Sequence, residues 1–246
     1  MTSKIDASAA GTLTLGGDIA VQRMGFGGMR LCGPGIWGWP QDRQNALAVL
    51  RRAVELGVTL IDTADAYGPH VNEEQIAQAL YPYPAGLTIA TKCGLVRPGP
   101  GKWDRDARPE RLRECAEGSL RRLRLERLDV LQLHAVDTQV PLSEQIGALT
   151  ELQREGKVRY IGISNVTLEQ LREARTMAQI VSVQNPFSVG QRHGNDAVVD
   201  YCQSEGLAFL PYFPLDAGDI GADRRLQAVA DARGATIYQI ALAWLL

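Results

Sequence analysis

The chain has 246 residues, of which 45% are hydrophobic and 22% charged, and its formal net charge is -2 at pH 7. This composition suits one large core, and without a basic run it gives no electrostatic reason to expect binding to nucleic acid or to an anionic membrane. The first ten residues lack a basic segment followed by an apolar one, and no stretch has the roughly 18 apolar residues of a membrane span. We therefore expect a soluble, cytoplasmic protein without a nucleic-acid or membrane partner.

Strand and helix patterns alternate along the first half of the chain. A hairpin is predicted around Gly16 and Gly17, with strands at Thr12–Leu15 and Ile19–Val21. The elements expected after it are a strand at Met24–Gly28, a helix at Gln41–Leu56, a strand at Val58–Asp62, a helix at Glu73–Leu80, a strand at Leu87–Lys92, a helix at Pro109–Arg124 and a strand at Leu128–His134. The loop Cys93–Arg108 is long, rich in glycine and proline, and contains Trp103, so we interpret it as a segment that covers the substrate.

The second half of the chain continues the same alternation. The expected elements are a helix at Ser143–Glu155, a strand at Val158–Ser164, a helix capped by Thr167 and Gln170 and ending at Met177, a strand at Ile180–Gln184, a helix at Asp196–Ser204, a strand at Leu207–Tyr212 and helices at Asp223–Arg233 and Ile237–Leu246. No G-x-G-x-x-G turn follows the first strand. The pattern therefore predicts an α/β protein, a single domain over residues 1–246 with about seven units of a (β/α)8 TIM barrel and an N-terminal β-hairpin.

Polar side chains stand where the expected strands end. They are Asp62, Lys92, His134, Ser164, Asn165, Gln184 and Tyr212, and Tyr67 lies in the loop five residues after Asp62. Each has an ordinary explanation when taken alone, such as a turn residue for Asp62 or a core histidine for His134. Because the carboxyl ends of barrel strands open onto one face, however, together they predict an active site there.

The chemistry of these side chains suits a carbonyl group that gains a hydride. A lysine cation at Lys92 is expected to lower the pKa of the Tyr67 phenol from its usual value near 10, and Asp62 to balance the lysine charge. His134 can hydrogen-bond the same substrate oxygen. No serine or cysteine lies beside a histidine at a sharp turn, and neither a carboxylate pair nor a metal-ligand spacing occurs, so a hydrolase is less expected. The four cysteines lie far apart and are expected to be reduced and buried.

Several of these segments resemble the successive signatures of the aldo-keto reductases. They are Leu60–Gly68, Thr91–Lys92, Leu131–His134, Gly162–Asn165, Val183–Asn185 and Pro211–Leu215, and the resemblance covers nearly the whole chain. It implies NADPH as the cofactor and a small carbonyl compound as the substrate. It also implies catalytic roles for Asp62, Tyr67, Lys92 and His134, with Tyr67 as the general acid. The implied cofactor-binding residues are Ser164, Asn165 and Gln184 at the carboxamide, Tyr212 stacked on the nicotinamide, and Pro214 and Leu215 after it.

Three further stretches are similar to a bacterial subgroup of this family that includes pyridoxal reductases. They are Leu31–Gly38, Tyr67–Val71 and Leu80–Tyr83, and they make pyridoxal a candidate substrate. The alternative is a slow or non-catalytic cofactor-binding regulatory subunit, as the potassium-channel β-subunits of the family are, or a truncated inactive product. Phe213 stands where the family more often has serine. His70, Trp37, Trp39 and Trp103 are candidate walls of the substrate pocket.

The C-terminal end also departs from the family pattern. The sequence stops within the apolar helical run at 241–246, with neither a capping glycine nor a further strand. An eighth strand and its helix are therefore missing, so we expect two exposed sheet edges. In the family that segment also carries basic residues that bind the 2′-phosphate. We expect residues 1–246 alone to fold poorly and to bind NADPH weakly, and the natural chain to continue.

Overall fold

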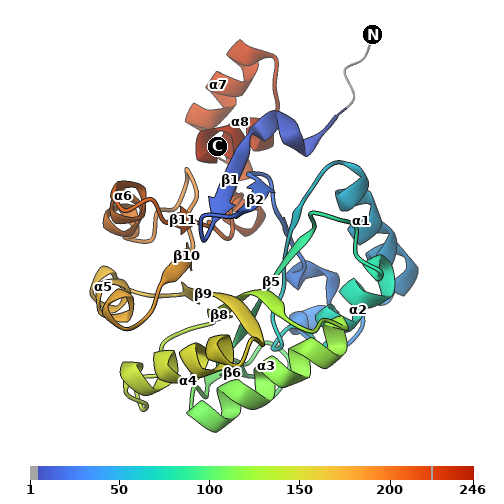
Figure 1. Cartoon of the computed structure of the whole chain (residues 1–246). Helices are drawn as coiled ribbons and strands as arrows, with labels where there is room; N and C mark the ends of the chain where they lie inside the picture. Colours follow the sequence, from blue (N-terminus) through green and yellow to red (C-terminus); the bar gives the residue numbers. More distant parts are fainter. Residues whose placement is uncertain (1–4, 223) are drawn as a thin grey trace.

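A curled parallel β-sheet forms the centre of the structure, a computed structural model that describes residues 5–222 and 224–246 (Figure 1). Its seven strands lie in the order β11-β10-β9-β8-β5-β4-β3. They are β3 (Phe26–Gly27), β4 (Leu60–Asp62), β5 (Thr88–Cys93), β8 (Leu128–Leu133), β9 (Val158–Ser164), β10 (Ile180–Gln184) and β11 (Ala208–Phe209). Among the described residues the sheet ends at β3 and β11, which confirms the expected fold class, an incomplete (β/α) barrel.

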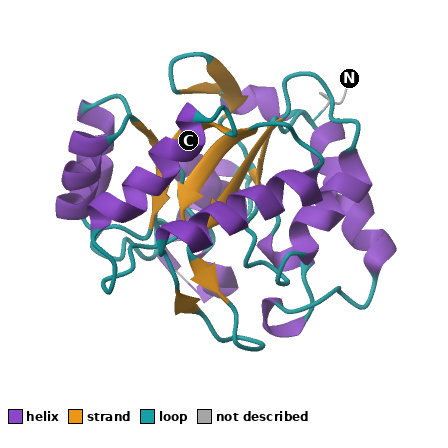
Figure 2. Cartoon of the chain, turned by 60° about the horizontal axis from the view of Figure 1, so that its bottom comes forward, coloured by secondary structure: helices purple, strands orange, loops and turns teal. Residues whose placement is uncertain are grey.

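Helices surround the sheet on its outer side, as the second view also shows (Figure 2). They are α1 (Arg43–Glu55), α2 (Val71–Leu80), α3 (Pro109–Leu123), α4 (Leu142–Arg154), α5 (Leu168–Met177), α6 (Asp196–Ser204), α7 (Arg224–Arg233) and α8 (Ile237–Leu245). Short 3-10 turns occur at η1 (Ala7–Ala10), η2 (Met29–Leu31), η3 (Pro34–Ile36) and η4 (Asp216–Ala222). The start predicted for α7, Asp223, lies outside the described residues.

Local sequence signals account for the helix ends. The Asp42 carboxylate accepts a hydrogen bond from the Asn45 backbone at 2.8 Å, so α1 begins just after it. Thr167 and Gln170 form the predicted capping box of α5. Gly57 has φ +86°, a conformation in which a side chain would be strained, and it ends the first helix as expected.

The N-terminal hairpin closes one end of the barrel. It comprises β1 (Thr12–Leu15) and β2 (Ile19–Gln22), paired around the predicted glycine turn. Its side chains Leu15 and Val21 are buried against Leu60 and Val130, which project from the sheet into the barrel. Because the hairpin occupies the end where the parallel strands begin, the opposite end, where they finish, is left for a site.

The structure corrects two predicted strands and one predicted loop. The expected strand Met24–Gly28 is only two residues long, and the expected strand Leu207–Tyr212 is reduced to β11. Both lie at an edge of the sheet, so each pairs on one side only. The long loop after β5 contains a hairpin of β6 (Leu95–Val96) and β7 (Asp104–Arg105), whose strands are too short for a periodic signal.

Two further observations concern membrane-spanning helices and the cysteines. The described helices include none with the length and apolar character needed to cross a bilayer. The cysteines Cys32, Cys93, Cys115 and Cys202 are all buried free thiols.

Candidate active site

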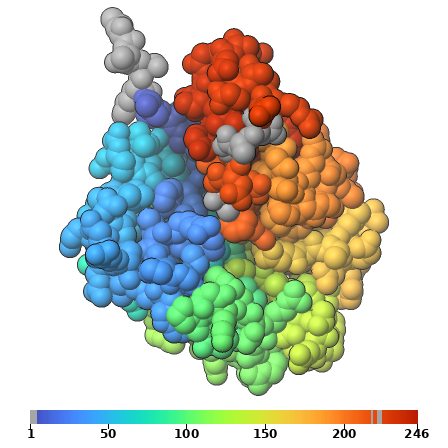
Figure 3. All heavy atoms as spheres, turned by 180° about the vertical axis from the view of Figure 1, so that it is seen from behind, coloured from blue at the N-terminus to red at the C-terminus, as the bar shows by residue number. Residues whose placement is uncertain are grey.

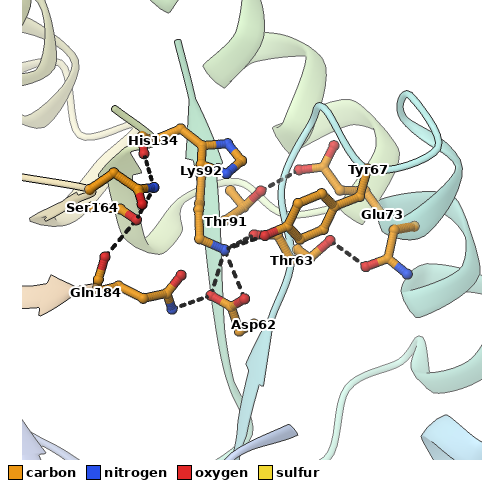
Figure 4. A network of polar contacts seen from close by, with 11 residues as sticks. Asp62, Thr63, Tyr67, Glu73, Thr91, Lys92, His134, Ser164 and Gln184 are labelled. Atoms are coloured by element: carbon orange, nitrogen blue, oxygen red, sulfur yellow. Dashed lines mark hydrogen bonds and ion pairs between the residues drawn. The ribbon is translucent and has the colours of Figure 1, made fainter. Parts of the chain in front are cut away.

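The polar cluster at the finishing end of the strands is centred on the Lys92 ammonium (Figure 4). Lys92, from β5, is fully buried, and its Nζ donates to both Asp62 carboxylate oxygens at 2.7 Å. The same nitrogen donates to the Thr63 carbonyl at 2.8 Å and lies 3.2 Å from the Tyr67 hydroxyl oxygen. The strands β4 and β5 and the loop after β4 therefore bring one anion and one phenol into direct contact with one cation.

The ammonium of Lys92 stays charged despite its burial. Burial alone would lower its pKa, but the Asp62 carboxylate and the Tyr67 oxygen outweigh that effect, and the net pKa lies above the usual 10.5. The ion pair is itself poorly exposed, with side-chain exposures of 1% for Lys92 and 20% for Asp62. A charge held so firmly can stabilise a negative oxygen formed beside it.

Tyr67 remains a phenol, which corrects one expectation from the sequence. Burial raises its pKa, and the Lys92 cation, which acts in the opposite direction, does not reverse the shift, so the net pKa lies above 10.0. The expected net lowering is wrong because the ring is enclosed, with only 6% of the residue exposed. The hydroxyl therefore carries its proton at neutral pH and can act as an acid.

His134, from the end of β8, is a neutral imidazole next to the phenol. Its ring meets the Tyr67 ring edge to face, with centroids 5.7 Å apart. Burial, followed by the Lys92 and Arg97 cations, holds its pKa well below 6.5. Its Nδ1 is buried and has no hydrogen-bond partner among the described residues. The histidine is therefore suited to hydrogen bonding rather than to carrying a charge.

Two buried networks hold the loop that carries Tyr67. The Thr63 hydroxyl donates to Asn72 Oδ1 at 2.8 Å, and Asn72 Nδ2 donates to the Gly28 carbonyl at 2.9 Å. A side chain at Gly28 would collide with Asn72, so glycine is needed for this approach. On the other side of the loop, Glu73 of α2 accepts from the Thr91 hydroxyl and from Arg122 Nε, both at 2.6 Å.

The predicted cofactor residues continue the hydrogen-bonded cluster. Gln184 Nε2 donates to Asp62 Oδ1 at 2.9 Å, and the Ser164 hydroxyl donates to the Gln184 carbonyl at 2.7 Å. Asn165 Nδ2 donates to the His134 carbonyl at 2.9 Å, while its Oδ1 accepts from the Tyr212 hydroxyl at 2.6 Å. An amide from β10, a hydroxyl and an amide from the end of β9, and a phenol ring therefore stand beside the Lys92 cluster.

Pro214 and Leu215 follow Tyr212 in a loop that turns back sharply. Phe213 before them has φ +53°, and the Leu215 carbonyl accepts from Gly218 in η4 at 2.9 Å. Both residues are half-buried, and they are linked to the cluster through the chain rather than by the hydrogen bonds just described. Seen from behind, the blue and cyan N-terminal part and the orange and red C-terminal part face each other across the centre, above the green segment (Figure 3).

Two residues of the long loop, the aromatic Trp103 and the cationic Arg97, lie near Tyr67. The Trp103 ring meets Tyr67 and His134 edge to face, at centroid distances of 6.2 and 6.3 Å. The structure therefore brings Trp103 to the cluster, as one of the four candidate walls. Trp37 lies on the neighbouring loop, bridged to Gly68, and Arg97 stands between the two tryptophans. The sequence offered no signal for Arg97, because it is one of three arginines in a glycine- and proline-rich loop that has no periodic pattern.

The other two candidate walls have different neighbours. The Arg43 guanidinium lies over the Trp39 ring, with its central carbon 4.6 Å from the ring centroid. His70 is the left-handed residue that precedes α2, and burial, with the Arg122 and Arg111 cations, lowers its pKa to about 4. Both of these arginines belong to α3.

Asp65 is a second buried carboxyl in the Tyr67 loop. It is 1% exposed, its Oδ1 has no partner among the described residues, and the buried Cys115 thiol acts on its pKa. Burial raises its pKa from 3.8 to about 7, with a smaller opposing effect of the thiol. The carboxyl therefore takes up a proton more readily in the folded chain than in the unfolded one.

We expect Asp65→Asn to remove a pH-dependent loss of stability. Between pH 4 and 7 the unfolded chain ionises Asp65 while the folded chain keeps it protonated, so the wild-type free energy of unfolding should fall by about 1.4 kcal/mol per pH unit from this group. Below pH 4 and above pH 7 its contribution is constant. His70 changes stability in the opposite sense between pH 4 and 6.5, so the relevant quantity is the difference between wild type and variant.

Urea unfolding of both proteins from pH 4.5 to 8 measures that difference. The variant should gain on the wild type as pH rises, and it should be the more stable protein at pH 8 by a few kcal/mol. Parallel stability curves for the two proteins would contradict the assignment.

Three kinds of comparison with known proteins, by family, by sequence and by structure, agree with one another. The model of the family described as "Aldo/keto reductase family" matches residues 23–246. Pyridoxine 4-dehydrogenase of Escherichia coli is 43% identical over 244 residues, covering 97% of this chain and 85% of the relative. The structure of a glycerol dehydrogenase from Gluconobacter oxydans superposes with a TM-score of 0.87 at 28% identity, covering 96% of this chain and 83% of that one. An aldo/keto reductase from Klebsiella pneumoniae, solved with NADP and acetate, gives a TM-score of 0.79 at 29% identity and covers 95% of this chain and 80% of its own.

Proposed function

This chain belongs to the aldo/keto reductase family, and from that premise we propose that it reduces an aldehyde or ketone to the alcohol with NADPH, with pyridoxal as the candidate substrate. The observation that carries the proposal is the contact of Lys92 Nζ with the Tyr67 hydroxyl at 3.2 Å and with the Asp62 carboxylate at 2.7 Å. A protonated phenol beside a fixed cation is an acid that can give up its proton when a neighbouring oxygen becomes negative.

The side chains around this cluster fit a nicotinamide. Carboxamide recognition needs donors and acceptors on one wall, and the amides of Asn165 and Gln184 with the Ser164 hydroxyl offer both. The Tyr212 ring, half-buried beside Asn165, offers a flat surface for stacking. We assign these four residues, with Pro214 and Leu215 in the adjoining loop, to the cofactor. Bound NADPH would supply the hydride, a chemistry that no side chain provides.

The protein's own residues would donate the proton to the carbonyl oxygen and stabilise the negative charge that forms. Tyr67 donates its proton to the carbonyl oxygen, and the Lys92 ammonium stabilises the phenolate that remains. Asp62 keeps the lysine charged in its buried position. His134, neutral and next to Tyr67, orients the carbonyl oxygen by a hydrogen bond.

Pyridoxal is proposed because of the relative named pyridoxine 4-dehydrogenase and because the rings of Trp103 and His134 lie beside Tyr67. The intact contact between Lys92, Asp62 and Tyr67 favours an enzyme over a cofactor-binding regulatory subunit, which would have no need of a proton donor.

The test is NADPH oxidation by the purified protein against a panel of aldehydes that includes pyridoxal. We expect pyridoxal to be reduced with a kcat/KM at least ten times that of acetaldehyde, because its ring buries more apolar surface on binding than a methyl group does. Product identification would show one alcohol formed for each NADPH consumed. Failure of every aldehyde in the panel to consume NADPH would reject the catalytic proposal in favour of a regulatory subunit or a truncated inactive product.

A further inference from the structure

Arg97 joins three separate segments at the mouth of the candidate site. Its Nη1 donates to the Ile36 carbonyl at 2.8 Å and to the Ala66 carbonyl at 3.1 Å. Its Nη2 donates to the Gly35 carbonyl at 2.7 Å, and its Nε donates to the Lys102 carbonyl, also at 2.7 Å. The four acceptors belong to the η3 turn, the Tyr67 loop and the loop between β6 and β7.

The acceptors are neutral carbonyl groups, although the guanidinium is charged and half-buried. Such a cation is stabilised by several well-directed hydrogen bonds rather than by one counter-ion, and a planar fork of five N–H groups is the side chain that can make them at once. A lysine has the charge but not the fork. The arrangement therefore depends on arginine itself.

The guanidinium also lies 3.7 Å from the centroid of the Trp103 ring. Trp103 is 37% exposed, and its ring meets the Tyr67 and His134 rings edge to face. Arg97 therefore links the backbone directly before Tyr67, through the Ala66 carbonyl, to the aromatic ring that stands beside the Tyr67 phenol. A backbone hydrogen bond from the Gly101 N–H to the Gly35 carbonyl at 2.9 Å also joins the Trp103 loop to the η3 turn.

We propose that Arg97 is a positioning residue that sets substrate specificity, by fixing Trp103 as a wall on which a planar aromatic aldehyde packs next to Tyr67. The inference rests on the proposed function for its substrate class, but its geometry concerns only this chain's residues. When a substrate packs on a ring that is already fixed, binding does not have to pay the entropy of ordering that ring. Aromatic ligands, which contact Trp103, therefore bind more tightly because Arg97 fixes it, whereas small aliphatic ligands do not.

Equilibrium binding of two carboxylates that differ in the ring tests the proposal without turnover. Calorimetry of the protein saturated with NADP would compare benzoate with acetate in the wild type, Arg97→Lys, Arg97→Ala and Trp103→Leu. Arg108→Ala is the matched control, because Arg108 lies in the same loop and pairs with Asp106 and Glu110 at the surface. Steady-state KM values for benzaldehyde and acetaldehyde would be measured on the same proteins.

We expect Arg97→Ala and Trp103→Leu to raise the Kd of benzoate about three- to tenfold and to leave the Kd of acetate unchanged. Arg97→Lys, which keeps the charge, should lose nearly as much as the alanine variant, whereas Arg108→Ala should lose nothing. The aldehydes should show the same split, with KM rising for benzaldehyde and kcat preserved. An equal loss for both carboxylates, or no loss for either, would overturn the proposal. Absence of aldehyde reduction in the wild type would reject the proposed function instead, since the carboxylate comparison does not depend on it.

Discussion

Tyr67→Phe should lower kcat for aldehyde reduction by about a hundred- to ten-thousandfold, the usual contribution of a general acid. The variant loses the phenolic proton and keeps the ring, so the edge-to-face contacts with Trp103 and His134 are preserved. Lys92 keeps its bonds to Asp62 and to the Thr63 carbonyl, because the hydroxyl is only one of its contacts and the longest, at 3.2 Å.

The measurement is single-turnover reduction with NADPH bound in advance, together with the Kd of NADPH and the urea unfolding midpoint. Affinity for NADPH should be unchanged, since Tyr67 is not among the residues assigned to the cofactor, and the midpoint should shift little. This combination separates a lost acid from a damaged site. A variant that turns over at the wild-type rate would show that the proton reaches the substrate by another route and that Tyr67 is not the acid.

Much of the fold follows from short-range signals in the chain. Ile146, Leu149 and Leu152 recur at helical spacing and are all fully buried in α4, and Thr167 with Gln170 marks the start of α5. The elements that the sequence predicts less well lie where long-range pairing decides their length. β3 and β11 are shortened because they stand at the sheet edges, and no residue within either segment indicates that position.

The candidate site divides in the same way. Asp62, Lys92 and His134 could be predicted because each lies within one residue of the end of a recognisable parallel strand, and strand ends in a barrel meet on one face. The sign of the Tyr67 pKa shift could not, because it depends on how completely the ring is enclosed by loops that come from elsewhere in the chain. Arg97 is the clearest omission, since its four partners lie in three segments whose proximity exists only in the folded structure.

Removal of the Asp62 charge should destabilise the protein strongly as well as abolish activity. In Asp62→Asn the Lys92 ammonium stays buried but loses its only carboxylate partner among the described residues. Breaking a buried ion pair in this way typically costs about 3 to 5 kcal/mol of the free energy of unfolding. Without the carboxylate the burial effect lowers the pKa of Lys92 below that of an unfolded lysine, so the unfolded chain binds more protons than the folded one.

Stability of Asp62→Asn should therefore rise towards that of the wild type as pH increases from 7 to 10, whereas in the wild type the Lys92 pKa lies above 10.5 and the pair contributes evenly over that range. The matched control is the double variant Asp62→Asn with Lys92→Met, which leaves no charge to bury. It should recover part of the lost stability at pH 7, because neutral replacement of a buried pair costs less than breaking it, and it should remain inactive. Urea unfolding at pH 7 and 9.5 gives all three values. A double variant that is less stable than Asp62→Asn at pH 7 would mean that Lys92 stabilises the fold through its stem and its bonds to Thr63 and Tyr67, and that Asp62 is not its essential counter-charge.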